Sequence, residues 1–313
     1  MRLKQIFFAL FLIISFPSRS QTDTIYYDAY WKICDFSFAD YYRVRTKLAN
    51  RMHKVEDHYM QNDKLQMTGY YSRFEPDIRN GVFVFYNKSG FKTEEGSYEG
   101  DKMNGEWKYY FDSSTSLSSI KNYIKGEPDG AFVSYYKSGG KHTEGNYQKG
   151  KQTGEWKSYY DSSMRVWATF DYGDSKQVKI ISYYRDGKIK RREEHDKHGD
   201  ISGKCYDEQG NETAFTPFEV MPKALYNFND FLNANIIYPI GARNRNMQGK
   251  VIVRFVVNTD GTITNLSIVQ SVDPELDGEA LRVVSTFPKW QPGIQDDSAI
   301  KVYFTLPIVF TLR

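Results

Sequence analysis

The sequence predicts a mainly β protein that ends in a small α+β domain. Three observations lead to this fold class. Glycine-marked turns recur at a nearly constant spacing through residues 55–212. Aromatic residues, which pack well on pleated strands, make up 16% of the 313 residues. From residue 223 onward, apolar residues at helical spacing precede a run of alternating apolar residues, which indicates a second domain.

Residues 1–20 have the layout of a secretory signal peptide. Arg2 and Lys4 precede an apolar run over residues 6–16, and small residues follow the next proline. We expect cleavage after Ser20 and a periplasmic protein. An uncleaved inner-membrane tether is the alternative, although an apolar helix of this length would cover only about 16 Å of a hydrocarbon core about 30 Å thick. Removal of the segment takes the formal net charge from +3 to zero, which predicts no general attraction to nucleic acid.

Residues 55–212 read as an array of β-repeats. Gly81, Gly105, Gly130 and Gly154 mark its turns and lie 24, 25 and 24 positions apart. Each unit contains two short strands, and an isolated hairpin cannot bury its aromatic face. The units are therefore expected to stack into an elongated, single-layer antiparallel sheet. Residues 21–54 are also strand-rich and are expected to cap its N-terminal end.

The repeats share the motifs NGEWKYYFDSS and TGEWKSYYDSS, with DGAFVSYYKSG between them. This pattern resembles MORN-type repeats, in the variant found in bacterial antitoxin-like and exported proteins. The resemblance implies a spacer, a scaffold or an interaction surface. The aromatic rings are expected mainly to hold the sheet together, and a ligand-binding aromatic face is the alternative.

Residues 213–222 contain two prolines and no repeat, which predicts a linker before a C-terminal domain at residues 223–313. Helical spacing then places five apolar residues on one face: Leu225, Phe228, Phe231, Leu232 and Ile236. The residue before a proline favours an extended conformation, so this helix should end at Tyr238. Pro239 can then start a second, short helix.

A hairpin is predicted next. Alternating apolar residues over 251–257 form one strand, the pair Asp260 and Gly261 is a strong turn signal, and the return strand covers 263–269. Asp273 stands before a proline and should start a third helix. The last strand, residues 299–312, contains Pro307, which cannot donate a ladder hydrogen bond, so this strand should lie at a sheet edge.

These elements together resemble the TonB C-terminal domain family over about residues 220–313. The pairs and runs that carry the resemblance are Tyr238-Pro239, Gln248-Gly249, Asp260-Gly261, Trp290-Gln291-Pro292-Gly293 and Leu306-Pro307. The family implies a three-stranded antiparallel sheet with two main helices. It also implies binding of the N-terminal segment of outer-membrane receptors by strand addition at the sheet edge.

By this resemblance, the partner-binding residues lie on the last strand and near the Tyr-Pro pair. They are Tyr238, Pro239, Arg243, Arg245, Ile300, Val302, Phe304, Leu306 and Val309. Each group has a simpler interpretation. Tyr238 can be a core aromatic residue, and the two arginines can belong to a solvated helix face.

The sequence leaves two functions open. One is a TonB-like module that engages outer-membrane receptors, or another envelope protein, in support of TonB-dependent transport. The other is an envelope scaffold whose repeat surface is the main interaction site. The chain lacks a clear permanent anchor and a proline-rich spacer, which puts direct energy transduction in doubt. The open edge of the last strand also makes a homodimer plausible.

Catalytic and metal-binding patterns are missing from the sequence. We find no phosphate loop, nucleophile elbow or dinucleotide motif, and the five histidines do not form an H-E-x-x-H motif. We therefore predict no enzyme, cofactor, metal, nucleic-acid partner or small-molecule substrate. Export would permit a disulfide between Cys34 and Cys205, but these cysteines lie at opposite ends of the repeat region, so the pairing stays open.

Overall fold

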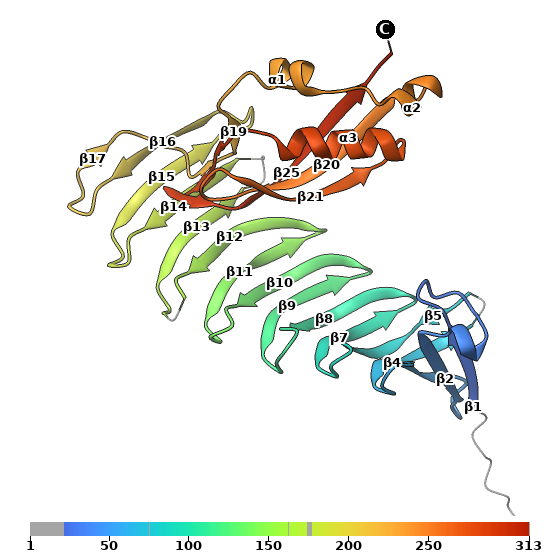
Figure 1. Ribbon diagram of the computed structural model, residues 1–313. Helices are drawn as coiled ribbons and strands as arrows, with labels where there is room; N and C mark the ends of the chain where they lie inside the picture. The colour runs from blue at the N-terminus through green and yellow to red at the C-terminus, as the bar shows by residue number, and fades with distance from the viewer. Residues whose placement is uncertain (1–21, 75, 162, 174–176, 313) are drawn as a thin grey trace, which may run out of the picture. The chain divides into compact units, whose positions relative to one another are not determined.

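The structure is a computed structural model that describes residues 22–74, 76–161, 163–173 and 177–312. The predicted signal peptide therefore lies outside the described residues. The chain divides into two compact units, Met1–Met164 and Arg165–Arg313. A long antiparallel sheet of 17 strands is followed by a small α+β part with three helices and small sheets, as the sequence predicts (Figure 1).

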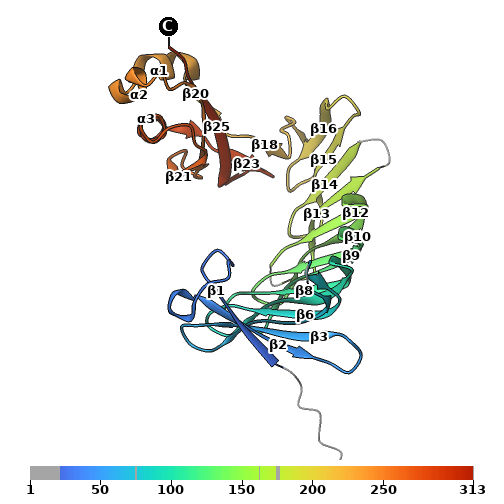
Figure 2. The ribbon, with the colours of Figure 1, turned by 90° about the vertical axis from the view of Figure 1, so that its right-hand side faces the viewer.

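The first unit contains strands β1 to β12 and one short 3-10 helix. Their bounds are β1 Thr22–Tyr27, η1 Phe36–Phe38, β2 Tyr41–Lys47, β3 His53–Tyr59, β4 Leu65–Arg73, β5 Ile78–Arg79, β6 Gly81–Tyr86, β7 Lys92–Glu99, β8 Lys102–Tyr110, β9 Leu117–Ile124, β10 Glu127–Tyr135, β11 Lys141–Gln148 and β12 Lys151–Tyr159. Figure 2 shows β6, β8, β9, β10 and β12 in succession along the sheet. Each strand from β6 to β12 pairs antiparallel with the next. Positive φ angles at Gly81, Gly105, Gly130 and Gly154 fit the glycine spacing seen in the sequence.

A tryptophan lying flat on a glycine holds neighbouring strands together in two repeats. Trp107 and Trp156 are buried, and a Cβ added to Gly96 or Gly145 would come within 2.3 or 2.2 Å of the indole ring. Each indole N–H donates to the carbonyl of the residue after that glycine, at 3.1 Å in both cases. These two glycines are therefore required by the rings that cover them.

Edge-to-face aromatic contacts continue this packing from strand to strand. Ring centroids lie 5.5 Å apart for Tyr71 and Phe83, 5.0 Å for Phe83 and Tyr98, and 5.1 Å for Tyr98 and Trp107. Such pairs contribute about 0.5–1.5 kcal/mol beyond the area they bury. The rings thus stabilise a sheet that is built from hairpins too small to fold alone.

The second unit contains the remaining repeat strands and the C-terminal domain. The repeat strands are β13 Val166–Tyr172, β14 Val178–Tyr183, β15 Ile189–His195, β16 Ile201–Tyr206 and β17 Glu212–Thr213. The other elements are β18 Glu219–Val220, β19 Lys223–Ala224, α1 Phe228–Asn235, α2 Ile240–Asn244, β20 Gly249–Val257, β21 Ile263–Gln270, α3 Pro274–Ser285, β22 Trp290–Gln291, β23 Gly293–Gln295, β24 Ser298–Ile300 and β25 Val302–Phe310.

The C-terminal domain has its own core between the β21–β20–β25 sheet and helix α3, which lies on one face of that sheet (Figure 1). Asn227 caps α1, and its side chain accepts hydrogen bonds from two backbone N–H groups of the first turn. Asp273 caps α3 in the same way, accepting from the N–H of Glu275 at 3.0 Å, which confirms the predicted helix start. Leu225, by contrast, is 69% exposed and precedes α1, because the helix begins only after the Asn227 cap.

The predicted last strand is divided into two pieces. Residues 298–300 form β24, which pairs with β23 in a tight hairpin, and β25 starts at Val302. Asp296 and Asp297 form the turn of this hairpin, and both have positive φ angles, 46° and 67°. The sequence pattern did not show this hairpin, because its strands are only three residues long.

Candidate functional site

Strand β25 lies at an edge of the C-terminal sheet, as the proline predicts. The sheet order is β21–β20–β25, and among the described residues β25 pairs only with β20. The register is regular from Val302 opposite Val257 to Phe310 opposite Gly249. One side of β25 therefore presents backbone groups that another extended chain can pair with.

Side chains of β25 alternate between the core and the surface. Leu306, Ile308 and Phe310 are buried in the core of the domain. Tyr303 is 73% exposed and Val309 58% exposed, and both point away from that core. A strand added to β25 would therefore find an aromatic and an aliphatic side chain on the solvent face.

Pro307 indicates which backbone groups face the open edge. A proline has no N–H, so it fits β25 when its nitrogen points away from β20. Tyr303, Thr305 and Val309 share its position in the alternation. We infer that these three residues direct their N–H and C=O groups toward the open side.

A pocket lies beside the residues that follow the C-terminal end of β25. It has a volume of about 540 Å³ and is lined by Tyr238, Arg243, Asn246, Thr311 and Leu312. The Tyr238 hydroxyl donates to the backbone carbonyl of Met247, the residue that follows Asn246. The guanidinium of Arg243 lies 5.6 Å from the centre of the Tyr238 ring. The pocket therefore combines an aromatic wall with a positive charge.

Tyr238 also belongs to the domain core. Its ring packs edge-to-face against Phe310, with centroids 5.8 Å apart, and Pro239 forms the N-cap of α2. Tyr238 therefore packs against the core, as its simpler interpretation has it, and the same side chain also lines the pocket.

Arg245 is held by carboxylates instead of facing the pocket. Its guanidinium donates to Asp273 at 2.8 Å and to Glu275 at 2.9 Å. The hydrogen bond from Arg245 holds the pKa of Asp273 below its ordinary value, and the same contact raises the pKa of Arg245. This arginine joins the loop after α2 to the start of α3, which is a structural role.

The structure brings some of the predicted residues together and separates others. Tyr238 and Arg243 meet at the end of β25, whereas Ile300 belongs to β24 and Leu306 is 8% exposed. Sequence reasoning missed the outward-facing Tyr303 and Thr305. The signal was present in the sequence, because these positions alternate with Val302, Phe304 and Leu306, whose side chains lie on the opposite face of the strand.

Two further features were sought in the described part of the chain, a metal-binding cluster and a membrane-spanning helix. No group of three or more His, Cys, Asp or Glu side chains is placed to hold a metal there. Over the same residues, every helix is too short or too polar to cross a bilayer. Cys34 and Cys205 are both free thiols.

The fold and this edge define a class of protein: a β-repeat array joined to an α+β domain whose sheet has an open edge. Residues 234–312 match the family described as Gram-negative bacterial TonB protein C-terminal. The C-terminal part is thus similar to the TonB C-terminal domain, a family of non-enzymatic protein-interaction domains.

Among solved structures, two solution structures of Helicobacter pylori TonB-CTD are similar to this chain. The first contains residues 179–285 of that protein and is 26% identical in sequence. The match covers 27% of this chain and 77% of the Helicobacter pylori chain, with a TM-score of 0.23. The second, of residues 194–285, is also 26% identical, covers 27% and 88%, and has a TM-score of 0.22. No curated protein matches the chain. The resemblance of the repeats to MORN-type repeats stays a prediction.

Proposed function

We propose that the C-terminal domain binds an extended peptide by adding it as a strand to β25. The peptide would be the N-terminal segment of an outer-membrane receptor or a segment of another envelope protein. The domain would act in the periplasm and support TonB-dependent transport. The observation that carries the proposal is the open edge of β25, flanked by two exposed apolar side chains and ending at a pocket.

Backbone and side chains would contribute differently to binding. The outward N–H and C=O groups of β25 would pair with any extended peptide, whatever its sequence. Tyr303 and Val309 would select apolar residues at alternate positions of the peptide. Arg243 would favour a carboxylate or a carbonyl group where the peptide reaches the pocket, and its stacking on Tyr238 keeps it in place.

Substitution of Thr305 tests strand addition directly. Thr305→Pro removes one outward N–H and places a ring at the edge, whereas Thr305→Val changes the side chain and keeps the backbone donor. The binding of N-terminal peptides of the organism's outer-membrane receptors is measured by calorimetry. We expect the Thr305→Pro variant to bind these peptides at least tenfold more weakly than the parent chain does. The valine variant should bind within about twofold.

Equal affinity of the proline variant and the parent would contradict strand addition at β25. Complete absence of binding by the parent at millimolar peptide would remove the receptor proposal itself. Circular dichroism of both variants checks that the β20–β25 pairing is retained.

An envelope scaffold remains the second candidate, and one observation favours it. The repeat sheet of the first unit carries a pocket of about 500 Å³, lined in part by Ile120, Val133 and Tyr135 and bordered by Glu144 and Lys157. This candidate predicts that charge reversal at Glu144 and Lys157 abolishes capture of envelope partners, while Thr305→Pro leaves it unchanged.

A further inference from the structure

A buried arginine of the repeat strands holds the acidic turn of the β23–β24 hairpin. Arg191, on β15, has a fully buried side chain. Its guanidinium donates to Asp296 at 2.6 Å and to Asp297 at 2.7 Å, so one arginine binds both carboxylates of the turn. Charge-assisted hydrogen bonds of this kind are strong and geometrically specific.

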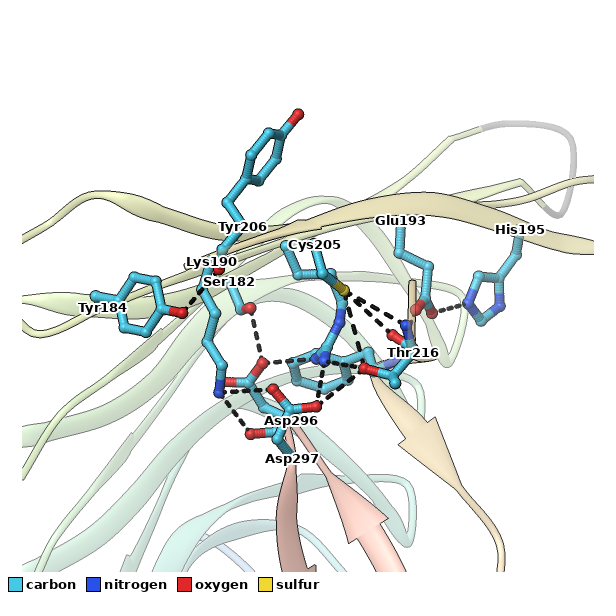
Figure 3. Close-up of polar contacts among 12 residues, drawn as sticks. Ser182, Tyr184, Lys190, Glu193, His195, Cys205, Tyr206, Thr216, Asp296 and Asp297 are labelled. Atoms are coloured by element: carbon cyan, nitrogen blue, oxygen red, sulfur yellow. Dashed lines mark hydrogen bonds and ion pairs between the residues drawn. The ribbon is translucent and has the colours of Figure 1, made fainter. Parts of the chain in front are cut away.

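Three further side chains complete the recess around the turn. Lys190 donates to Asp296 and lies 3.1 Å from a carboxylate oxygen of each aspartate. Ser182 donates to Asp296 at 2.8 Å, and Thr216 donates to Asp297 at 3.0 Å (Figure 3). All four carboxylate oxygens of the turn thus have at least one partner from outside the hairpin.

The charges balance at this site. Burial raises the pKa of Asp297, but the hydrogen bond from Lys190 and the charges of Arg191 and Lys190 lower it, and the result is a pKa below the ordinary value. Two adjacent carboxylates and two adjacent cations therefore neutralise each other. A buried arginine without these partners would be strongly unfavourable.

The backbone of the turn is the second independent observation. Both aspartates have positive φ angles, 46° and 67°, and a two-residue hairpin turn with this geometry favours Asn-Gly. Aspartate tolerates the left-handed region less well than glycine. The turn therefore has residues that are less favourable for its backbone conformation than Asn-Gly would be. These two residues are the ones whose carboxylates bind Arg191.

Phe218 connects the recess to the hairpin through the backbone. Its N–H donates to the buried carboxylate of Glu193, and its carbonyl accepts from the N–H of Asp296 at 2.7 Å. Its ring stacks on Trp167 with centroids 5.7 Å apart, and the Arg191 guanidinium lies 5.8 Å from the ring centre. Phe218, which precedes the C-terminal domain in the chain, therefore contacts both the repeat strands and the hairpin.

We propose that Ser182, Lys190, Arg191 and Thr216 form a binding site for a paired-carboxylate turn, and that its occupant is Asp296–Asp297 of the same chain. The site acts as a latch that fixes the C-terminal domain on strands β13 to β17. This role is independent of what binds at β25. An acidic peptide from another protein could enter the site only by displacing the turn.

The experiment uses the accessibility of Cys205, which reports on the latch. Cys205 is 7% exposed, and its Sγ lies 3.6 Å from the carbonyl oxygen and 3.5 Å from the backbone nitrogen of Thr216. Release of the turn would free Thr216 and uncover the thiol. We would measure the rate of maleimide labelling of the full exported chain under native conditions, in a Cys34→Ser background that leaves Cys205 as the single thiol.

The main variant is Asp296→Asn/Asp297→Gly. Asn-Gly is the favoured pair for this turn, so the hairpin should fold at least as well as in the parent. The variant lacks both carboxylate charges that bind Arg191. We expect labelling to be at least tenfold faster than in the parent. Arg191→Lys, which keeps the charge and loses the planar fork, should accelerate labelling to a smaller but measurable extent.

Glu194→Gln is the matched control. Glu194 lies on the same strand as Arg191, and its ion pair with Lys179 is exposed, so labelling should not change. A rate for the Asn-Gly variant within twofold of the parent would overturn the latch. If the Asp296→Asn/Asp297→Gly variant lost its native circular dichroism, the test would rest on Arg191→Lys. An unchanged labelling rate of Cys205 in Arg191→Lys would then overturn the latch.

Discussion

At the scale of single residues, the protein uses the charge of an arginine to join backbone segments that are distant in the sequence. Arg245 joins the loop after α2 to the first turn of α3 through Asp273 and Glu275. Arg191 does the same for the β23–β24 turn. In both cases one guanidinium binds two carboxylates, which a lysine could not do with the same geometry.

The Arg245 contact predicts a pH-dependent effect on stability. The pKa of Asp273 is lowered in the folded state, so its contribution is present above its unfolded value of about 3.9 and is lost as the pH falls through the folded value. We expect Arg245→Gln to lower the urea midpoint at pH 7. The difference from the parent should shrink below about pH 4.

Arg243→Gln serves as the control for this measurement, because Arg243 contacts an aromatic ring and makes no ion pair among the described residues. Its effect on the urea midpoint should not depend on pH between 3 and 7. A constant difference between Arg245→Gln and the parent across this range would show that the ion pair is not the cause.

At the scale of elements, the repeat strands depend on the tryptophan–glycine pairs. Gly96→Ala would place a methyl group 2.3 Å from the Trp107 ring, so the ring or the strand must move. We expect the free energy of unfolding to fall by about 1–3 kcal/mol, as for other overpacked cores. Urea denaturation followed by tryptophan fluorescence measures this change.

Gly278→Ala is the matched control for the same substitution. Gly278 lies within α3, and an added Cβ there would contact nothing within 4 Å. Alanine favours the helix over glycine by about 0.5–1 kcal/mol, so this variant should be more stable than the parent. Destabilisation of similar size at both glycines would indicate that crowding by Trp107 is not the reason.

The sequence predicted elements that depend on local signals and missed those that depend on contacts between distant residues. Asp273 before a proline marked the start of α3, and Pro307 placed β25 at an edge. The partner of Gly96 lies on the next strand, and the partners of Asp296 lie in the repeats. Neither spacing nor composition encodes such pairs, so no role was predicted for the two aspartates.

At the scale of the whole molecule, the second unit should fold without the first. Its core and the contacts of Arg191 all lie within Arg165–Arg313. We expect a fragment of residues 165–313 to give a dispersed amide NMR spectrum and a cooperative thermal transition. A fragment of residues 219–313, which lacks Arg191, should melt at a lower temperature, because Asp296 and Asp297 lose their partners.

The comparison of fragments separates two sources of stability. If both fragments melt at the same temperature, the repeat strands add nothing to the C-terminal domain, and the ion pairs of Arg191 only offset their own desolvation. A fragment of residues 165–313 that fails to fold would show instead that the boundary at Met164 and Arg165 does not separate independent units.

Pro307 has a consequence for the solubility of the protein. An exposed strand edge is a template on which identical chains can polymerise into growing sheets. Two β25 strands that paired with each other would each bring a proline to the shared ladder, so the contact would lose two donors and gain two rings. A foreign peptide without a proline would meet only the one proline of β25, so that ladder would lose one donor instead of two. We therefore expect Pro307 to disfavour the pairing of two β25 strands more than it disfavours the addition of a foreign strand.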